Sequence, residues 1–213
     1  MSVSENTFLM MLPVALLAGC ANYATLQEVD TMPKGHSKTG VGVTGTSYKV
    51  DAGGKLDSVA VPAVNVWYRR GLTDNLEAHA AAWIPLGGSA GVKYQLAGNR
   101  TTAGPSLSLG VDFGFLQMST TDDMDNTSKQ TVVDTYIPVY LGYRTGPGFA
   151  LYASPKYILR TSTGDAGTAL GHLAGGTVGL AIGARTQFLL EGTVIYDISL
   201  GAPAFQGGIG VAF

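Results

Sequence analysis

The chain has 213 residues, of which 46% are hydrophobic and only 13% are charged, about half the charged share of a typical soluble domain. Its 30 glycines argue against a helical bundle, because glycine costs about 1 kcal/mol at each helical position. The formal net charge of −2 and the absence of a basic run argue against nucleic-acid binding. A single cysteine excludes an internal disulfide and a zinc site built on cysteines.

The first residues are typical of an export signal. An apolar run, Phe8–Ala18, is too short for a membrane-spanning helix but has the length of a signal-peptide core. The tetrapeptide Leu17-Ala18-Gly19-Cys20 that follows it resembles the lipobox of bacterial lipoproteins, in which the mature chain begins at an acylated cysteine. This resemblance implies a signal peptide at 1–19 and lipidation at Cys20. The alternative interpretation is a small buried cysteine after an apolar stretch.

Residues 20–38 are predicted to be the lipidated cysteine and a polar periplasmic linker, and residues 39–213 a β-barrel. Beyond the linker, apolar residues recur with a period of two, as on strands with two different faces. The clearest example is 107–115, where Leu, Val and Phe alternate with small or polar residues. Ten such segments lie near 39–50, 58–71, 75–85, 88–96, 105–118, 130–144, 148–160, 171–183, 187–199 and 205–213. We therefore predict an all-β, antiparallel up-and-down transmembrane barrel of about 10 strands, with 8 or 12 as alternatives.

The connections between these segments form two sets. Those after even-numbered strands are mostly short, whereas Ser119–Lys129 and Thr161–Gly171, after odd-numbered strands, are longer and polar. Short periplasmic turns and longer exterior loops are typical of outer-membrane barrels. An even strand number also returns the C-terminus to the periplasm.

The last strand ends in an alternating apolar pattern that closes on Phe213. It resembles the C-terminal signal that the outer-membrane assembly machinery recognises. The stretches 64–96 (VNVWYRRGLTDNLEAHAAAWIPLGGSAGVKYQL) and 31–43 (TMPKGHSKTGVGV) are similar to small, poorly characterised outer-membrane barrels of Gram-negative bacteria. The resemblance implies a bacterial outer-membrane location, with membrane lipids and the assembly machinery as partners, and no established activity.

If the apolar face contacts lipid, the polar face lines the lumen, because outward charges at mid-membrane cost about 2–4 kcal/mol. A lumen network is then predicted from Asn65, Arg69, Glu77, His79, Lys93, Asp112, Asp134, Tyr136, Tyr140, Tyr152, Lys156, Arg160, Glu191 and Asp197. It either plugs the barrel or lines a narrow pore, and a barrel of this size favours the plug. A turn centred on Thr73 predicts that Arg69 stands directly opposite Glu77.

Two other function classes are weighed against this interpretation. A barrel enzyme would need a base such as His79 beside Glu77, or His172 with Asp165, but neither context matches a lipid-modifying or proteolytic site. A tethered, soluble lipocalin-like barrel would need charged residues outside, and the chain has too few of them. We therefore expect a lipid-anchored, non-catalytic barrel with a structural role or narrow-pore solute passage, without metal or cofactor.

Overall fold

The computed structural model describes residues 22–51, 56–84, 87–121, 127–146, 148–165, 167–199 and 201–213. The predicted signal peptide and the predicted lipidation site Cys20 lie outside the described residues. No helix in the described part of the chain is long and apolar enough to cross a membrane.

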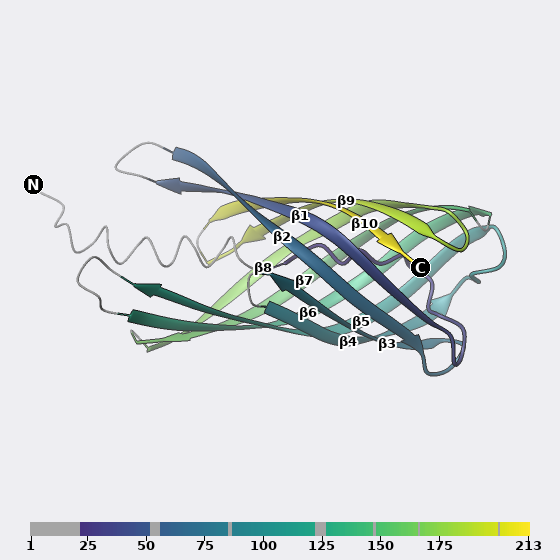
Figure 1. Cartoon of the computed structure of the whole chain (residues 1–213), viewed down its shortest axis with the longest axis horizontal. Coiled ribbons are helices and arrows are strands. Elements are labelled where there is room, and N and C mark those ends of the chain that lie inside the picture. Colours follow the sequence, from purple (N-terminus) through teal and green to yellow (C-terminus); the bar gives the residue numbers. More distant parts are fainter. Residues whose placement is uncertain are drawn as a thin grey trace, which may run out of the picture.

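Ten antiparallel strands close into one barrel, in which each strand pairs with its neighbours in sequence and β1 pairs with β10 (Figure 1). The strands are β1 (Ser37–Asp51), β2 (Leu56–Gly71), β3 (Leu76–Ile84), β4 (Gly87–Ala97), β5 (Gly104–Thr121), β6 (Thr127–Gly146), β7 (Phe149–Gly164), β8 (Gly167–Ile182), β9 (Gln187–Asp197) and β10 (Ala202–Ala212). The backbone of Phe213 bonds to that of Thr39 in both directions, at 2.8 and 3.1 Å, and completes the closure. The predicted fold class and the count of ten strands are confirmed.

The barrel has two different ends. One end, called here the C-terminal rim, carries the C-terminus and the turn Leu72–Asn75. The other end, called the hairpin rim, carries the last residues of β5 and β7 and the first residues of β6 and β8 (Figure 1). The long loops predicted for 119–129 and 161–171 are wrong, because β5 to β8 continue through most of these residues. Threonines favour this extension, since β-branched residues suit strands and can pair across them, as Thr163 Oγ1 and Thr168 Oγ1 do at 3.3 Å. The difference between the two ends of the barrel therefore comes from strands that extend beyond the rest of the barrel.

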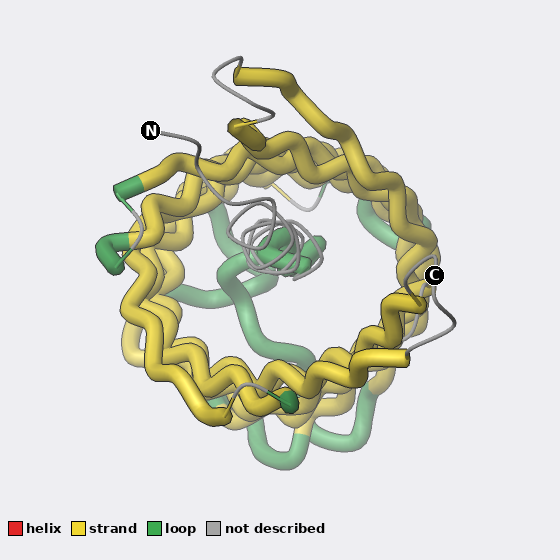
Figure 2. The backbone as a smooth tube through the Cα atoms, turned by 90° about the vertical axis from the view of Figure 1, so that its left-hand side faces the viewer, coloured by secondary structure: helices red, strands yellow, loops and turns green. Residues whose placement is uncertain are grey.

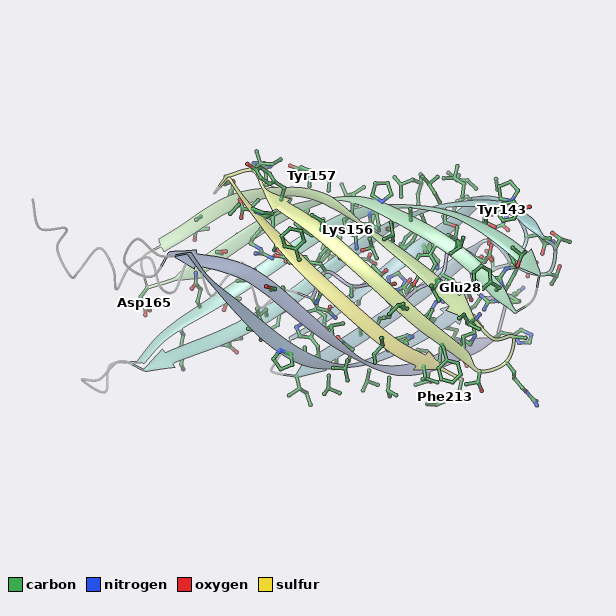
Figure 3. All side chains as sticks on the ribbon, turned by 90° about the horizontal axis from the view of Figure 1, so that it is seen from above. Glu28, Tyr143, Lys156, Tyr157, Asp165 and Phe213 are labelled. Atoms are coloured by element: carbon green, nitrogen blue, oxygen red, sulfur yellow. The ribbon has the colours of Figure 1, made fainter. Side chains whose placement is uncertain are left out.

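The two faces of the wall differ as the alternation predicts. Along β9, burial alternates at every residue: Phe188 is 60% exposed and Tyr196 47%, whereas Glu191 and Ile195 are buried. Tyr143, Tyr157 and Phe213 likewise lie on the outside of the ribbon in Figure 3. Large apolar side chains thus face outward and charged ones inward, the opposite of what a lipocalin-like barrel requires.

The segment before β1 lies inside the barrel. Residues 22–34 run through the ring of strands as an irregular chain, visible as the central loop in Figure 2. Tyr23, Leu26, Glu28 and Asp30 are each at most 2% exposed. The prediction of a periplasmic linker at 20–38 is therefore wrong for residues 22–32, whereas residues 33–36 are exposed and residues 37–38 already belong to β1. A wall with inward charges needs partners, and this segment supplies carboxylates and backbone groups for them.

Candidate functional site

The lumen near the C-terminal rim holds the acidic part of this inserted segment, residues 22–34. Arg144 of β6 donates from Nε and Nη2 to Asp30 Oδ2, at 2.9 and 2.7 Å, and from Nη2 to Glu28 Oε2. Arg100, in the turn between β4 and β5, donates to the other oxygen of Glu28. Lys93 Nζ donates to the Glu28 carbonyl at 2.9 Å. Glu28 is fully buried, and Figure 3 places it within the barrel.

Arg69 and Glu77 form a buried, bidentate ion pair beside this cluster. Arg69 Nε and Nη2 lie 2.8 Å from the two Glu77 oxygens. The predicted register is wrong by two residues, because Arg69 pairs with His79 and Glu77 pairs with Gly71. The long arginine side chain reaches its partner diagonally along the same face of the sheet. Glu77 also accepts from the backbone N–H of Met32 at 2.8 Å, which links the pair to the inserted segment.

Farther from the rim, the wall satisfies the backbone of the inserted segment. Glu191 accepts from the N–H groups of Thr25 and Gln27, at 2.9 and 3.2 Å, and from the Tyr152 hydroxyl at 2.7 Å. Gln206 Oε1 accepts from the N–H groups of Tyr23 and Ala24. An irregular buried chain has no neighbouring strand to accept hydrogen bonds from its N–H groups. The side chains of Glu191 and Gln206 supply these acceptors instead.

Toward the hairpin rim, the wall pairs with itself. Arg160 donates from Nε and Nη2 to the two oxygens of Asp134, at 2.8 and 2.7 Å, from directly paired positions of β7 and β6. Lys156 Nζ donates to the Tyr23 carbonyl at 2.7 Å. The Tyr23 side chain belongs to an apolar cluster with Tyr136, Ile158, Leu173, Ile195 and Ala204. This half therefore closes around the segment by packing rather than by ion pairs to it.

Wall glycines make the space that the segment fills. A Cβ added to Gly142 would lie 2.4 Å from a methyl group of Val29, and one added to Gly42 would lie 2.9 Å from Leu26. At Gly71, a Cβ would meet the Pro33 carbonyl at 2.2 Å. Any larger residue at these positions would clash with the segment, so the inner surface is shaped for it.

A cavity of about 40 Å³ remains between the segment and the wall. His79, Trp83, Asp112 and Lys156 contribute to its lining, and His79 Nε2 contacts Asp112 Oδ1. His79 Nδ1, Trp83 Nε1 and Gln27 Oε1 are buried and have no hydrogen-bond partner within the described part of the chain. A polar cavity of this size has room for water.

The structure places every residue of the predicted lumen network on the buried inner face: Asn65, Arg69, Glu77, His79, Lys93, Asp112, Asp134, Tyr136, Tyr140, Tyr152, Lys156, Arg160, Glu191 and Asp197. Lys93 Nζ lies 5.1 Å from the Tyr140 ring centroid, and Asn65 donates to Thr44 at 3.0 Å. Asp197 accepts from the Ser199 N–H at the hairpin rim. The network therefore falls into separate groups rather than one continuous cluster.

Sequence reasoning missed several members of the site: Glu28, Asp30, Lys38, Gln95, Arg100, Ser106, Ser108, Arg144, Gln187 and Gln206. Arg144 follows the outward Tyr143, so the alternation alone could have identified it. Glu28 and Asp30 lie outside any periodic stretch, and their sequence context carries no comparable signal.

His172, the other candidate for a catalytic base, lies on the outer face. His172 Nδ1 is hydrogen-bonded to the Tyr157 hydroxyl, and both side chains are exposed. Asp165 lies at the tip between β7 and β8, at the hairpin rim (Figure 3). Within the described residues, no group of three or more His, Cys, Asp or Glu could hold a metal ion.

No protein-family model matches this chain, and no curated protein matches it in sequence. Among solved structures, it is similar to the COG4313 outer membrane channel from Pseudomonas putida F1, with a TM-score of 0.47 and 12% identity over 90% of this chain and 98% of that one. It is also similar to Ail, the attachment invasion locus protein of Yersinia pestis, with a TM-score of 0.41 and 9% identity over 85% and 100%. The translocator domain of autotransporter NalP from Neisseria meningitidis gives a TM-score of 0.43 and 11% identity over 98% and 95%. At these identities the likeness concerns the fold alone.

Proposed function

We propose that this chain is a non-catalytic barrel of the bacterial outer membrane. Its own N-terminal segment closes the lumen, and withdrawal of the segment opens a narrow polar passage for solutes. The observation that carries the proposal is the inserted segment itself, which fills the lumen through hydrogen bonds and ion pairs.

The outer surface supports a membrane location. Exposed aromatic side chains gather near the C-terminal rim: Tyr68, Tyr94, Tyr143, Phe188 and Phe213. On β9, Phe188 and Tyr196 are separated by eight residues, or about 27 Å along a strand. At a tilt of about 40° this corresponds to about 21 Å across the membrane, close to the apolar band of about 25 Å in outer-membrane barrels. Leu190 and Val194, about half exposed, fill the interval.

The contacts of the segment support a removable plug. Among the described residues before β1, one backbone bridge joins the segment to the sheet, Lys34 to Gly71, at the end where the segment enters β1. The other described contacts combine hydrogen bonds and ion pairs with apolar packing of Tyr23, Leu26 and Val29 against the wall, and none of these described contacts belongs to a strand ladder. The segment can therefore leave without disrupting any strand ladder.

Planar-bilayer recording of two proteins tests this proposal. The full chain with Cys20→Ser, which cannot be acylated, is expected to be silent or to open rarely, because the segment occupies the lumen. A variant that lacks residues 22–34 is expected to give clear single-channel steps. If the folded deletion variant is silent, the wall side chains alone occlude the lumen and the segment is a permanent structural filler.

Lipid anchoring at Cys20 is a second part of the proposal and conflicts with the plugged state. Asn22 is hydrogen-bonded to Gln206, which lies six residues from the C-terminal rim end of β10, or about 20 Å along the strand. Two residues span at most about 7 Å, so acyl chains on Cys20 cannot reach the periplasmic leaflet while Asn22 is in the lumen. Lipidation there requires the segment to withdraw.

Labelling with radioactive palmitate and intact-mass spectrometry test the anchor. We expect acylation of the wild-type chain and none after Cys20→Ser. If lipidation holds the segment outside the lumen, the acylated protein will conduct more often than the Cys20→Ser variant. An unmodified Cys20 in protein purified from membranes would exclude the anchor.

The proposal of a non-catalytic barrel is supported by the contacts of the histidines. His79 is bonded to Asp112 beside the segment, and His172 is bonded to Tyr157 on the outer face. Neither arrangement includes a described hydrogen bond from a serine or threonine hydroxyl to the imidazole, which nucleophilic catalysis would use. Unchanged phospholipid and peptide substrates after incubation with purified barrel would be the expected assay result.

A further inference from the structure

The cations at the C-terminal rim outnumber the carboxylates that the wall supplies to them. Five cationic side chains gather there from β1, β2, β4, β6 and the β4–β5 turn: Lys38, Arg69, Lys93, Arg100 and Arg144. In the described part of the chain, the ion pairs of this basic cluster include one wall carboxylate, Glu77, which lies 2.8 Å from Arg69 and 3.4 Å from Lys93. The other two carboxylates, Glu28 and Asp30, belong to the inserted segment.

The segment occupies the basic cluster in the manner of a bound anionic ligand. The cluster holds two side-chain carboxylates, together with the Glu28 and Asp30 carbonyls, which accept from Lys93 and Arg69 at 2.9 Å each. Lys38 is connected through Gln187, whose amide donates to Glu28 at 3.2 Å. Arg100 Nη1 is buried without a hydrogen-bond partner among the described residues. The cluster therefore has more donors than the segment uses.

The opposite half of the lumen lacks this imbalance. Asp134 is paired with Arg160 and Asp112 is in contact with His79, so these carboxylates are already held within the wall. When the segment leaves, uncompensated charge develops at the C-terminal rim, where a ring of cations acts on every passing ion.

We propose that the basic cluster is an anion-binding constriction, masked in the plugged state by Glu28 and Asp30, and that the open barrel selects anionic solutes that carry carboxylate or phosphate groups. This inference rests on the proposed function, because it describes the passage that opens when the segment withdraws. Guanidinium groups match carboxylate and phosphate oxygens with paired hydrogen bonds, which explains why arginines predominate in the cluster.

Reversal potentials of the deletion variant in a KCl gradient test the proposal, with chloride and inorganic phosphate as the probes. We expect the reversal potential to lie on the chloride side, and phosphate to reduce the chloride current as its concentration rises. In the same background, Arg144→Glu is expected to move the reversal potential toward potassium. Arg185→Glu, an equal charge change in an exposed turn of the same rim, is the matched control and is expected to leave the potential unchanged.

The outcomes separate this inference from the function on which it rests. Channels that show no ion preference, or prefer potassium, would overturn the anion constriction and leave the plugged pore standing. A folded deletion variant without channels would overturn both. If the deletion variant does not fold, the full chain with Glu28→Gln and Asp30→Asn gives the same test, because its segment is kept but no longer neutralises the cluster. We expect this variant to open more often than wild type, with anion-selective steps.

Discussion

The two halves of the lumen neutralise their buried charges in different ways. Near the hairpin rim, Arg160 and Asp134 occupy paired positions on adjacent strands, so their ion pair forms as the barrel forms. Near the C-terminal rim, Arg144 finds its partners, Glu28 and Asp30, on the inserted segment. The ion pair of the first half therefore forms within the wall, whereas the cations of the second half are neutralised only when the segment is in place.

The largest effect is expected from Asp134→Ala, which leaves Arg160 buried and without its carboxylate. We expect a loss of about 3–5 kcal/mol in the free energy of unfolding, measured by urea titration in detergent. The loss should persist in the variant that lacks residues 22–34, because Asp134 and Arg160 both belong to the wall, although Arg160 there also loses the Tyr23 hydroxyl that lies 3.3 Å from its Nη2. A loss that disappears in the deletion variant would mean that this half also depends on the segment.

A smaller effect that does depend on the segment is expected from Arg144→Ala. In the full chain the change leaves Glu28 and Asp30 short of donors and should cost about 2–3 kcal/mol. In the deletion background those carboxylates are absent, so removal of one cation from the basic cluster should be neutral or stabilising. Equal losses in the two backgrounds would contradict the assignment of Arg144 to the segment.

The Arg69–Glu77 pair is expected to depend on the segment only in part. Both residues belong to the wall, but Glu77 also accepts a hydrogen bond from the Met32 N–H of the segment. A double-mutant cycle with Arg69→Ala and Glu77→Ala should give a coupling of about 1 kcal/mol or more. Glu77→Ala should cost more than Arg69→Ala, since Glu77 also neutralises Lys93. Additive single effects in urea unfolding would show that the bidentate pair does not form in the membrane protein.

The smallest effect is expected on the outer face. Tyr157→Phe removes the hydroxyl that bonds to His172, where both side chains are exposed. We expect a change of at most about 0.5 kcal/mol in unfolding and no change in conductance. A large effect would mean that Tyr157 and His172 interact with a partner other than membrane lipid.

Periodicity identified the wall but not its plug. Alternation assigned Glu191 and Asp134 to the lumen because a strand turns every second residue to the same face. Glu28 and Asp30 follow no period, since an irregular chain takes its shape from the surface that surrounds it. The register of Arg69 and Glu77 was missed because the geometry of the turn Leu72–Asn75, where the Leu72 N–H bonds to the Leu76 carbonyl, sets the pairing.

The alternation of apolar residues also did not predict how far the strands extend at the hairpin rim. Thr161 and Thr163 read as loop residues because the stretch is polar, yet they continue β7. Beyond an apolar band, a strand needs no apolar face, so polarity no longer distinguishes strand from loop there.

Occupation of the lumen by residues 22–34 is the central claim, and a disulfide tests it most directly. A Cβ built on Gly142 lies 3.2 Å from the Val29 Cβ, close to the separation of about 3.5–4.5 Å found in disulfides. In a Cys20→Ser background, Val29→Cys with Gly142→Cys should cross-link on mild oxidation of the membrane-embedded protein and abolish its channel openings until a reductant is added. Val29→Cys with Leu141→Cys, whose side chain faces outward, is the control and should not cross-link. Failure of the Gly142 pair to cross-link, or equal cross-linking of the two pairs, would contradict the plugged barrel.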